Sequence, residues 1–238
     1  MSFEKPFGKG LLAYLNGDQT PHRIHRDDGY VDDATFDPYF SEYDDWPQYE
    51  KDALREVKGT VLDIGCGAGR HALWLQTKEF KVTAIDISPQ AVEVAIRRGV
   101  KDCKAMSGLQ LSFDQTSFDT VLLLGNNFGI AGNPEATKKM LQDIHRITTL
   151  EGKIIASSRD PAVTDNPAHL KYHELNRKRG RPIGQVTIRI EYKGELGDWF
   201  DLLLASPSDM ARIGEAAGWK MERLFKENAG YAAVLSRL

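Results

Sequence analysis

The chain has too little cysteine for a fold held together by disulfides or zinc. Cys66 and Cys103 are its two cysteines in 238 residues, too few for a disulfide framework or a cysteine zinc site. No basic stretch followed by an apolar run opens the sequence, and no apolar run is long enough to span a membrane. These absences predict a reduced, cytoplasmic protein without a membrane partner.

The chain also lacks an excess of charge of one sign. Its 31 Lys and Arg against 34 Asp and Glu give a net charge of -3, which argues against a nucleic-acid-binding surface over the whole domain. Internal repeats and low-complexity tracts are absent from the sequence. With 41% hydrophobic residues, a chain of this length suits one α/β domain with additions.

Residues 61–70 read Val-Leu-Asp-Ile-Gly-Cys-Gly-Ala-Gly-Arg, which predicts a buried strand followed by a glycine-rich turn. Glycine allows the backbone to turn sharply and to approach a ligand, because no Cβ blocks a positive φ or the approach itself. A helix predicted from Ala68 to about Lys78 would point its free N–H groups at that ligand. The spacing Gly-x-Gly-x-Gly differs from the Gly-x-Gly-x-x-Gly of dinucleotide-binding proteins.

Strands and helices alternate over residues 60–160. The predicted strands are 61–64, 81–86, 102–106, 118–124 and 153–157. Ser88-Pro89 and Asn133-Pro134 each begin a helix, Gly99 ends the first of these, and Glu151-Gly152 is predicted to turn into the fifth strand. This alternation predicts a parallel sheet covered by helices on both faces.

The glycine loop, with Asp63 two residues before its first glycine, resembles the S-adenosylmethionine (SAM) loop of the class I methyltransferases. The resemblance covers about residues 60–160 and depends on the order and spacing of several motifs. It implies an α/β fold with a doubly wound, seven-stranded, mostly parallel sheet whose last strand is reversed. The last two strands are expected over 220–226 and 231–236.

The resemblance also implies a cofactor site for SAM, with S-adenosylhomocysteine (SAH) as the product. Asp86 would accept hydrogen bonds from the ribose hydroxyls, or act as a helix-capping or turn acid, and Ile87 would pack on the adenine. Asp63 would face the methionine end of SAM, fix the glycine turn, or do both. The predicted cofactor-binding residues are Asp63, Gly65, Cys66, Gly67, Gly69, Arg70, Asp86, Ile87, Ser107, Gly108, Leu109, Gly125 and Asn126.

Two segments depart from the family's pattern. Ser107 stands where many relatives have an acid, so we expect a weaker or backbone-mediated contact with the adenine. Gly125-Asn126-Asn127 follows the fourth strand, where an asparagine can bind the cofactor or the substrate, or can cap the loop. This segment is not the Asn-Pro-Pro-aromatic motif of base-amino methyltransferases, which disfavours DNA adenine methylation.

Two regions lie outside the resemblance. Residues 1–56 are rich in aromatic side chains and are predicted to be a helical and loop cover over the ligand site, in the same domain as residues 57–238. Residues 160–205 are predicted to be an insertion that is polar to 184 and then forms a β-hairpin turning at 194–197. Ser206 and Asp209 are expected to cap the next helix.

The sequence does not specify the catalytic residues. The methyl group of SAM is already activated, so the protein mainly has to align the acceptor with it. Tyr30 and Tyr39 can orient an acceptor or line a pocket around the sulfonium, or they only pack. Arg159 can hold an acidic group of a substrate, or it pairs with a surface acid such as Asp160. His169 and His173 have the i, i+4 spacing of metal ligands on a helix, but no third ligand fits, so no metal is predicted.

The sequence therefore predicts a SAM-dependent methyltransferase that transfers a methyl group to a small-molecule acceptor by in-line displacement. The cover and the hairpin favour a compact acceptor. The alternatives are a protein or RNA methyltransferase, at which the basic run 177–181 hints, and a non-catalytic SAM-binding regulatory protein.

Overall fold

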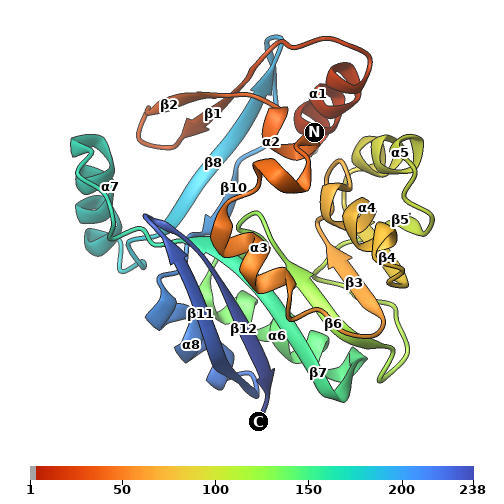
Figure 1. Ribbon diagram of the computed structural model, residues 1–238. Helices are drawn as coiled ribbons and strands as arrows, with labels where there is room; N and C mark the ends of the chain where they lie inside the picture. Colours follow the sequence, from red (N-terminus) through yellow and green to blue (C-terminus); the bar gives the residue numbers. More distant parts are fainter. Residues whose placement is uncertain (1–3) are drawn as a thin grey trace. The chain divides into compact units, whose positions relative to one another are not determined.

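The computed structural model describes residues 4–238 and contains two sheets (Figure 1). The larger sheet has seven strands in the order β11-β12-β7-β6-β3-β4-β5, which confirms the predicted α/β fold. The second sheet has the order β10-β8-β1-β2, with β9 paired to β8, and includes β8 (Gln185–Tyr192) and β10 (Phe200–Leu203). No helix of the described residues is long and apolar enough to cross a membrane.

The chain divides into two compact units. The first comprises the residues up to Trp46, Gly59–Leu111 and Thr187–Phe200, and the second comprises Pro47–Lys58, Ser112–Val186 and Asp201–Leu238. The predicted division into a cover of residues 1–56 and a domain of residues 57–238 stays a prediction.

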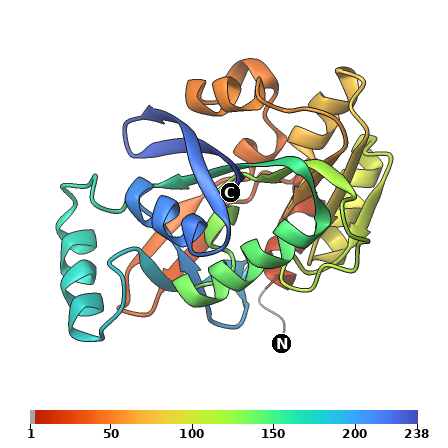
Figure 2. The ribbon, with the colours of Figure 1, turned by 90° about the horizontal axis from the view of Figure 1, so that it is seen from below.

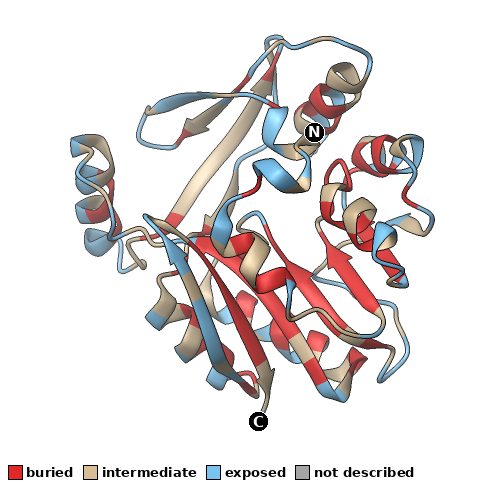
Figure 3. Cartoon of the chain, viewed as in Figure 1, coloured by how far each residue is buried: buried red, intermediate tan, exposed pale blue. Residues whose placement is uncertain are grey.

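The first unit contains the glycine loop and most of the predicted cover. Its helices are α1 (Lys5–Leu15), α2 (Asp37–Phe40), η1 (Tyr43–Asp45), α4 (Arg70–Thr77) and α5 (Pro89–Arg98). Its strands are β1 (His22–Arg26), β2 (Val31–Ala34), β3 (Val61–Ile64), β4 (Val82–Asp86), β5 (Cys103–Ala105) and β9 (Glu195–Leu196). Strands β3 and β5 both run parallel to β4, and every residue of β3 and β4 is buried (Figure 3).

The second unit is a layered structure of strands and helices. Its strands are β6 (Phe118–Leu123), β7 (Thr148–Arg159), β11 (Trp219–Glu227) and β12 (Gly230–Arg237). Its helices are α3 (Gln48–Leu54), η2 (Asn127–Gly129), α6 (Pro134–Ile147), α7 (Pro167–Lys178) and α8 (Pro207–Glu215). Helices α6 and α8 lie on one face of these strands and α3 on the other (Figure 2). Strand β12 runs antiparallel to both β7 and β11, which confirms the reversed last strand.

Three predicted helix starts are confirmed by the hydrogen bonds of their N-caps. The side chain of Ser88 accepts from the N–H of Ala91 at 3.3 Å, and that of Asn133 accepts from Ala136 at 2.9 Å. The Ser206 hydroxyl accepts from the N–H of Asp209 at 3.1 Å. Each of these bonds satisfies one N–H that would otherwise lack a helical partner.

The prediction that the N-terminal segment contains helices and loops alone is wrong. Strands β1 and β2 form an antiparallel hairpin there, and β1 also pairs with β8 of the predicted insertion hairpin, with Ile24 opposite Ile190. The local sequence His-Arg-Ile-His-Arg of β1 has one apolar residue and no alternation, so pairing with β2 on one side and with the distant β8 on the other makes it a strand.

The structure adds one helix and corrects one further expectation. The polar stretch 160–184 contains α7, which begins with Asn166-Pro167, the same N-cap and proline pair that correctly predicted α6. Glu151-Gly152 is not a turn before a strand but lies within β7. Phe118 pairs with Thr148 and Thr120 with Lys153, so the intervening residues of β7 form an irregularity in the ladder instead of ending it.

Candidate functional site

The glycine loop joins β3 to α4 in a conformation that needs its glycines. Gly65, Gly67 and Gly69 have φ values of 72°, 55° and 80°, in the left-handed region. A Cβ on Gly69 would lie 2.7 Å from Val100 Cγ2, whereas one on Gly67 would have its nearest neighbour, Tyr39 Cδ1, at 3.6 Å. Gly69 is therefore required by packing against Val100, just after α5, while Gly67 leaves room for a group that approaches the backbone.

Asp86 ends β4 beside this loop and is 9% exposed. Its Oδ2 accepts from the N–H of Gly67 and its Oδ1 from the N–H of Ser88, both at 2.9 Å. Burial raises the pKa of Asp86, and the two N–H bonds oppose that change. Asp86 thus acts as the turn acid, and each oxygen retains a lone pair that can accept a hydroxyl. Asp63 is buried on β3, with 2% of its surface exposed.

Two apolar side chains are exposed at the same edge of the sheet as Asp86. Ile87 is 43% exposed and Leu109 is 49% exposed. The chain after β5 is held at this edge because the N–H of Met106 donates to the Asp86 carbonyl at 2.9 Å. The Ser107 hydroxyl accepts from the N–H of Leu109 at 3.2 Å, so it stabilises its own turn. The edge therefore combines a carboxylate with exposed apolar surface, which fits a nucleoside.

Part of the N-terminal segment lies against the glycine loop within the first unit. Tyr39 of α2 is the nearest side chain to Gly67, and its ring centroid is 5.0 Å from that of Phe7 on α1. Buried Leu11, Phe36 and Tyr192 share one apolar cluster with Ala68 of the loop. Helix α1 also packs closely on the start of α5, since a Cβ on Gly8 would lie 2.2 Å from the Ser88 hydroxyl.

An aromatic cluster joins η1 to α4 next to the loop. Tyr43 stacks on Trp74 with ring centroids 4.6 Å apart and planes 2° from parallel, and Trp46 meets His71 edge-on at 4.8 Å. Arg70 lies over the Trp46 ring at 5.0 Å and donates to the Ser41 hydroxyl at 3.3 Å. Arg70, predicted to bind the cofactor, therefore holds the cover segment as well.

The structure separates the two candidate tyrosines. Tyr39 lies at the glycine loop, whereas Tyr30 lies in the turn between β1 and β2, where the Arg26 guanidinium stacks 4.6 Å from its ring centroid. Arg26 also donates to both carboxylate oxygens of Asp28, at 2.8 and 2.9 Å. Tyr39 is thus the better placed of the two to affect a molecule bound at the loop.

The remaining candidates belong to the second unit. Gly125 has a φ of 67°, donates its N–H to the Ser157 hydroxyl at 2.9 Å, and has open space where a Cβ would stand. Asn126 has a φ of 72° and precedes η2, in agreement with the turn interpretation. Arg159 is exposed at the end of β7, and among residues 4–238 it forms no ion pair, so the expected pairing with Asp160 is not found.

The histidines and the basic run have structural partners. His25 lies 2.6 Å from the Glu191 carboxylate, and His169 lies 3.2 Å from the Thr164 hydroxyl. The described part of the chain contains no group of three potential metal ligands from His, Cys, Asp and Glu. In the basic run, the guanidinium of Arg181 lies 3.9 Å from the Asp201 carboxylate.

Comparisons with known proteins agree with this geometry. Residues 61–152 match the family model of a methyltransferase domain. The structure is similar to that of a SAM-dependent methyltransferase from Bacteroides fragilis in complex with SAH, with 29% identity, a TM-score of 0.84, and coverage of 100% of this chain and 96% of that one. The CcbJ methyltransferase of Streptomyces caelestis, at 13% identity and a TM-score of 0.61, shares the fold over 84% of this chain and 97% of its own.

Curated sequences match over a shorter range. The cypemycin N-terminal methyltransferase of a Streptomyces species is 32% identical over 106 residues, which are 43% of each protein. The chain thus covers less than half of the length of the curated relatives that it matches.

Proposed function

Because this chain belongs to the class I SAM-dependent methyltransferases, we propose that it transfers the methyl group of SAM to a small-molecule acceptor. The family prediction made from the glycine loop is confirmed, and SAM is the cofactor. The observation that carries the choice of acceptor is the cover: Tyr39 and the cluster around Phe36 lie on the glycine loop. Such a cover favours a compact acceptor over a macromolecular surface.

The residues of the first unit fit SAM. When bound, SAM supplies a methyl group that is already activated on a sulfonium. We expect Asp86 to hold the ribose hydroxyls, Ile87 and Leu109 to flank the adenine, and Gly67 to allow the close approach of the methionine part. Tyr39 would exclude water from the loop and present its ring to the positive sulfonium.

The acceptor needs an apolar binding surface near the same loop, and one face of the second sheet provides it. Side chains alternate between the two faces of a strand, so Ile188, Ile190 and Tyr192 of β8 share a face, and Ile24 lies on it opposite Ile190. At one end of this face Tyr192 is buried in the cluster that includes Ala68 of the glycine loop.

Further along that face the isoleucines are half-buried. Ile24, Ile188 and Ile190 all have intermediate exposure, so apolar surface is left beside the cluster that reaches the cofactor loop. This face supports an acceptor with an apolar body, held by area burial while its reactive atom meets the methyl group. Within this unit, Tyr39 and Tyr30 remain the proposed side chains for orienting its polar groups.

The acceptor type is tested by methyl transfer from labelled SAM into small-molecule and macromolecular fractions of a cell extract. Label in the small-molecule fraction supports the proposal and yields a compound to identify. Label in peptide or protein would instead favour the class of the cypemycin relative, and label in RNA would direct attention to residues 177–181. SAH binding without any transfer would leave a non-catalytic SAM-binding protein.

A pair of variants tests this apolar face once an acceptor is known. Ile24→Gln should raise the KM for the acceptor by about tenfold, the effect of losing ~1.4 kcal/mol of apolar burial, with SAM affinity unchanged. Val31→Gln is the matched control, because Val31 is 45% exposed and lies opposite His25, on the other face of the sheet. Equal effects of the two substitutions would remove this face from the acceptor site.

A further inference from the structure

One side chain connects the cover segment to the glycine loop. Arg98, the last residue of α5, donates from Nη1 to the Ala68 carbonyl at 2.7 Å. The same guanidinium donates to the carbonyls of Tyr39 and Phe40 in α2, both at 3.4 Å, and lies 4.9 Å from the centroid of the Phe40 ring. Arg98 therefore bonds at once to the cofactor loop and to the helix that carries Tyr39.

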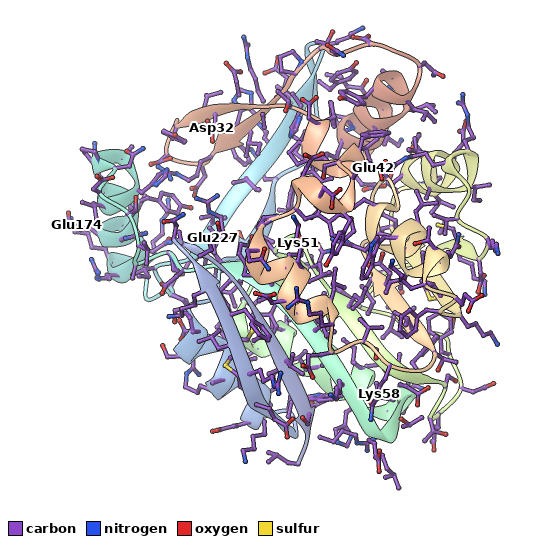
Figure 4. The ribbon with its side chains drawn as sticks, in the orientation of Figure 1. Asp32, Glu42, Lys51, Lys58, Glu174 and Glu227 are labelled. Atoms are coloured by element: carbon purple, nitrogen blue, oxygen red, sulfur yellow. The ribbon has the colours of Figure 1, made fainter. Side chains whose placement is uncertain are left out.

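Arg98 is partly buried, so its guanidinium depends on these hydrogen bonds. Burial lowers the pKa of the guanidinium, and the charge of Glu42, just after α2, opposes that change (Figure 4). A partly buried cation is costly unless its N–H groups are bonded. Two of the three carbonyls belong to α2, so a movement of α2 away from the loop leaves Arg98 with the Ala68 carbonyl.

We propose that Arg98 is a positioning residue that latches α2, and with it the Tyr39 ring, over the cofactor loop. This inference rests on the proposed function in one respect, namely that SAM binds at this loop. SAM and SAH can then leave only as fast as the latch opens, so Arg98 sets the dwell time of the cofactor. The stack of Tyr43 on Trp74 holds the neighbouring η1 and adds a second attachment of the same cover.

The test is the dissociation rate of SAH from Arg98→Gln, measured by stopped-flow tryptophan fluorescence. Trp46 and Trp74 lie in the aromatic cluster that joins η1 to α4 and serve as reporters. We expect dissociation about tenfold faster in Arg98→Gln, with the association rate changed much less. Arg97→Gln is the matched control, because Arg97 is on the same turn of α5 and bonds to Asn16 and Glu93 instead.

Rescue separates positioning from simple destabilisation. Arg98→Lys keeps the charge but loses the fork that reaches several carbonyls, so its dissociation rate should fall between wild type and Arg98→Gln. A wild-type rate in Arg98→Gln, or an equal acceleration in Arg97→Gln, overturns the latch. If Arg98→Gln does not fold, a wild-type rate in Arg98→Lys overturns it. None of these rates depends on the acceptor, so failure of the small-molecule proposal shows separately, in the labelling experiment.

The two cysteines, far apart in sequence, bring their Sγ atoms to 3.8 Å from each other. Cys66 lies in the glycine loop and is 6% exposed, whereas Cys103 on β5 is partly exposed. The hydrogen bond between the two sulfurs lowers the pKa of the Cys103 thiol, and the same bond, together with burial, raises the pKa of the Cys66 thiol.

We propose that hydrogen peroxide converts Cys66 and Cys103 into a disulfide that disables the cofactor loop. The Cys103 thiolate attacks one peroxide oxygen, the O–O bond breaks, and Cys103 becomes a sulfenic acid; the departing hydroxide takes up the proton released by the Cys103 thiol and becomes water. Cys66 then attacks that sulfur, the S–O bond breaks, and a second water leaves. Two thiols and one peroxide thus give one disulfide and two waters.

The disulfide disturbs the loop because the sulfurs must approach from 3.8 Å to about 2.05 Å. Cys66 is flanked by Gly65 and Gly67, so the backbone can follow its side chain. That movement strains the bond from the Gly67 N–H to Asp86, which is 2.9 Å long. Asp86, the carboxylate proposed to bind the ribose, and the glycine loop then no longer hold the relative positions in which both contact SAM.

The experiment treats the protein with hydrogen peroxide and compares wild type with Cys103→Ser. For wild type we expect loss of two hydrogens in the intact mass, SAM affinity lowered at least about tenfold, and recovery with dithiothreitol. Cys103→Ser should bind SAM like wild type before treatment and keep that affinity afterwards. A wild-type protein that gains oxygen without losing the two hydrogens, a disulfide that leaves SAM affinity unchanged, or an equal loss in Cys103→Ser overturns the inference.

Discussion

Asp86→Asn is the sharpest test of the cofactor site, because it changes the charge and the hydrogen-bonding pattern at almost constant volume. Both carboxylate oxygens accept backbone N–H groups, from Gly67 and Ser88 at 2.9 Å. An amide keeps one of these acceptors and turns an NH₂ donor toward the other N–H, whichever way it is oriented. The substitution therefore costs one of these two bonds and the charge that the ribose hydroxyls would meet.

The magnitude follows from the bonds involved. Loss of charge-assisted bonds should weaken SAM binding by about 1–3 kcal/mol, which is roughly 5- to 150-fold in Kd. Titration calorimetry with SAM and SAH measures this directly, and a thermal unfolding curve checks that the protein folds. Asp102→Asn is the control, because Asp102 is in the same unit and accepts from the Thr83 hydroxyl at 2.7 Å. A Kd for Asp86→Asn within twofold of wild type would remove Asp86 from the site.

Three other substitutions test the roles assigned to individual residues. Gly67→Val should abolish SAM binding and leave a folded protein, and normal SAM binding by this variant would show that the cofactor does not bind at the loop. Gly69→Ala should instead lower the unfolding free energy by ~1–3 kcal/mol, because its Cβ would lie 2.7 Å from Val100 Cγ2. Burial lowers the pKa of His22 to about 4, so below about pH 6.5 the unfolded chain binds a proton that folded His22 does not. The unfolding free energy should therefore fall as the pH drops from about 6.5 toward 4, by about 2 kcal/mol at pH 5. His22→Phe should lack this loss in urea unfolding at pH 5 and 7, and an unchanged pH dependence would contradict the assignment.

The sequence by itself determined the parts of the protein whose causes are local. The glycine loop follows from residues that adopt its positive φ values at the least steric cost, and the helix starts at Ser88 and Asn133 follow from side chains that bond to N–H groups three residues on. Asp86 was predictable because a parallel strand carries its last residue to the ligand edge of the sheet. These features were enough to predict a methyltransferase domain, which the family model matches over residues 61–152, before any tertiary contact was known.

Only the tertiary structure decided what lies on that loop. Tyr30 and Tyr39 are equivalent candidates in the sequence, and the packing of α2 brings Tyr39 to Gly67 while Tyr30 lies in a turn. Arg98 resembles any basic residue in the last turn of a helix, and its three carbonyl partners lie far away along the chain. Pairing of β1 with β8, like the approach of the two cysteines, joins distant segments, and no local pattern of residues encodes such contacts.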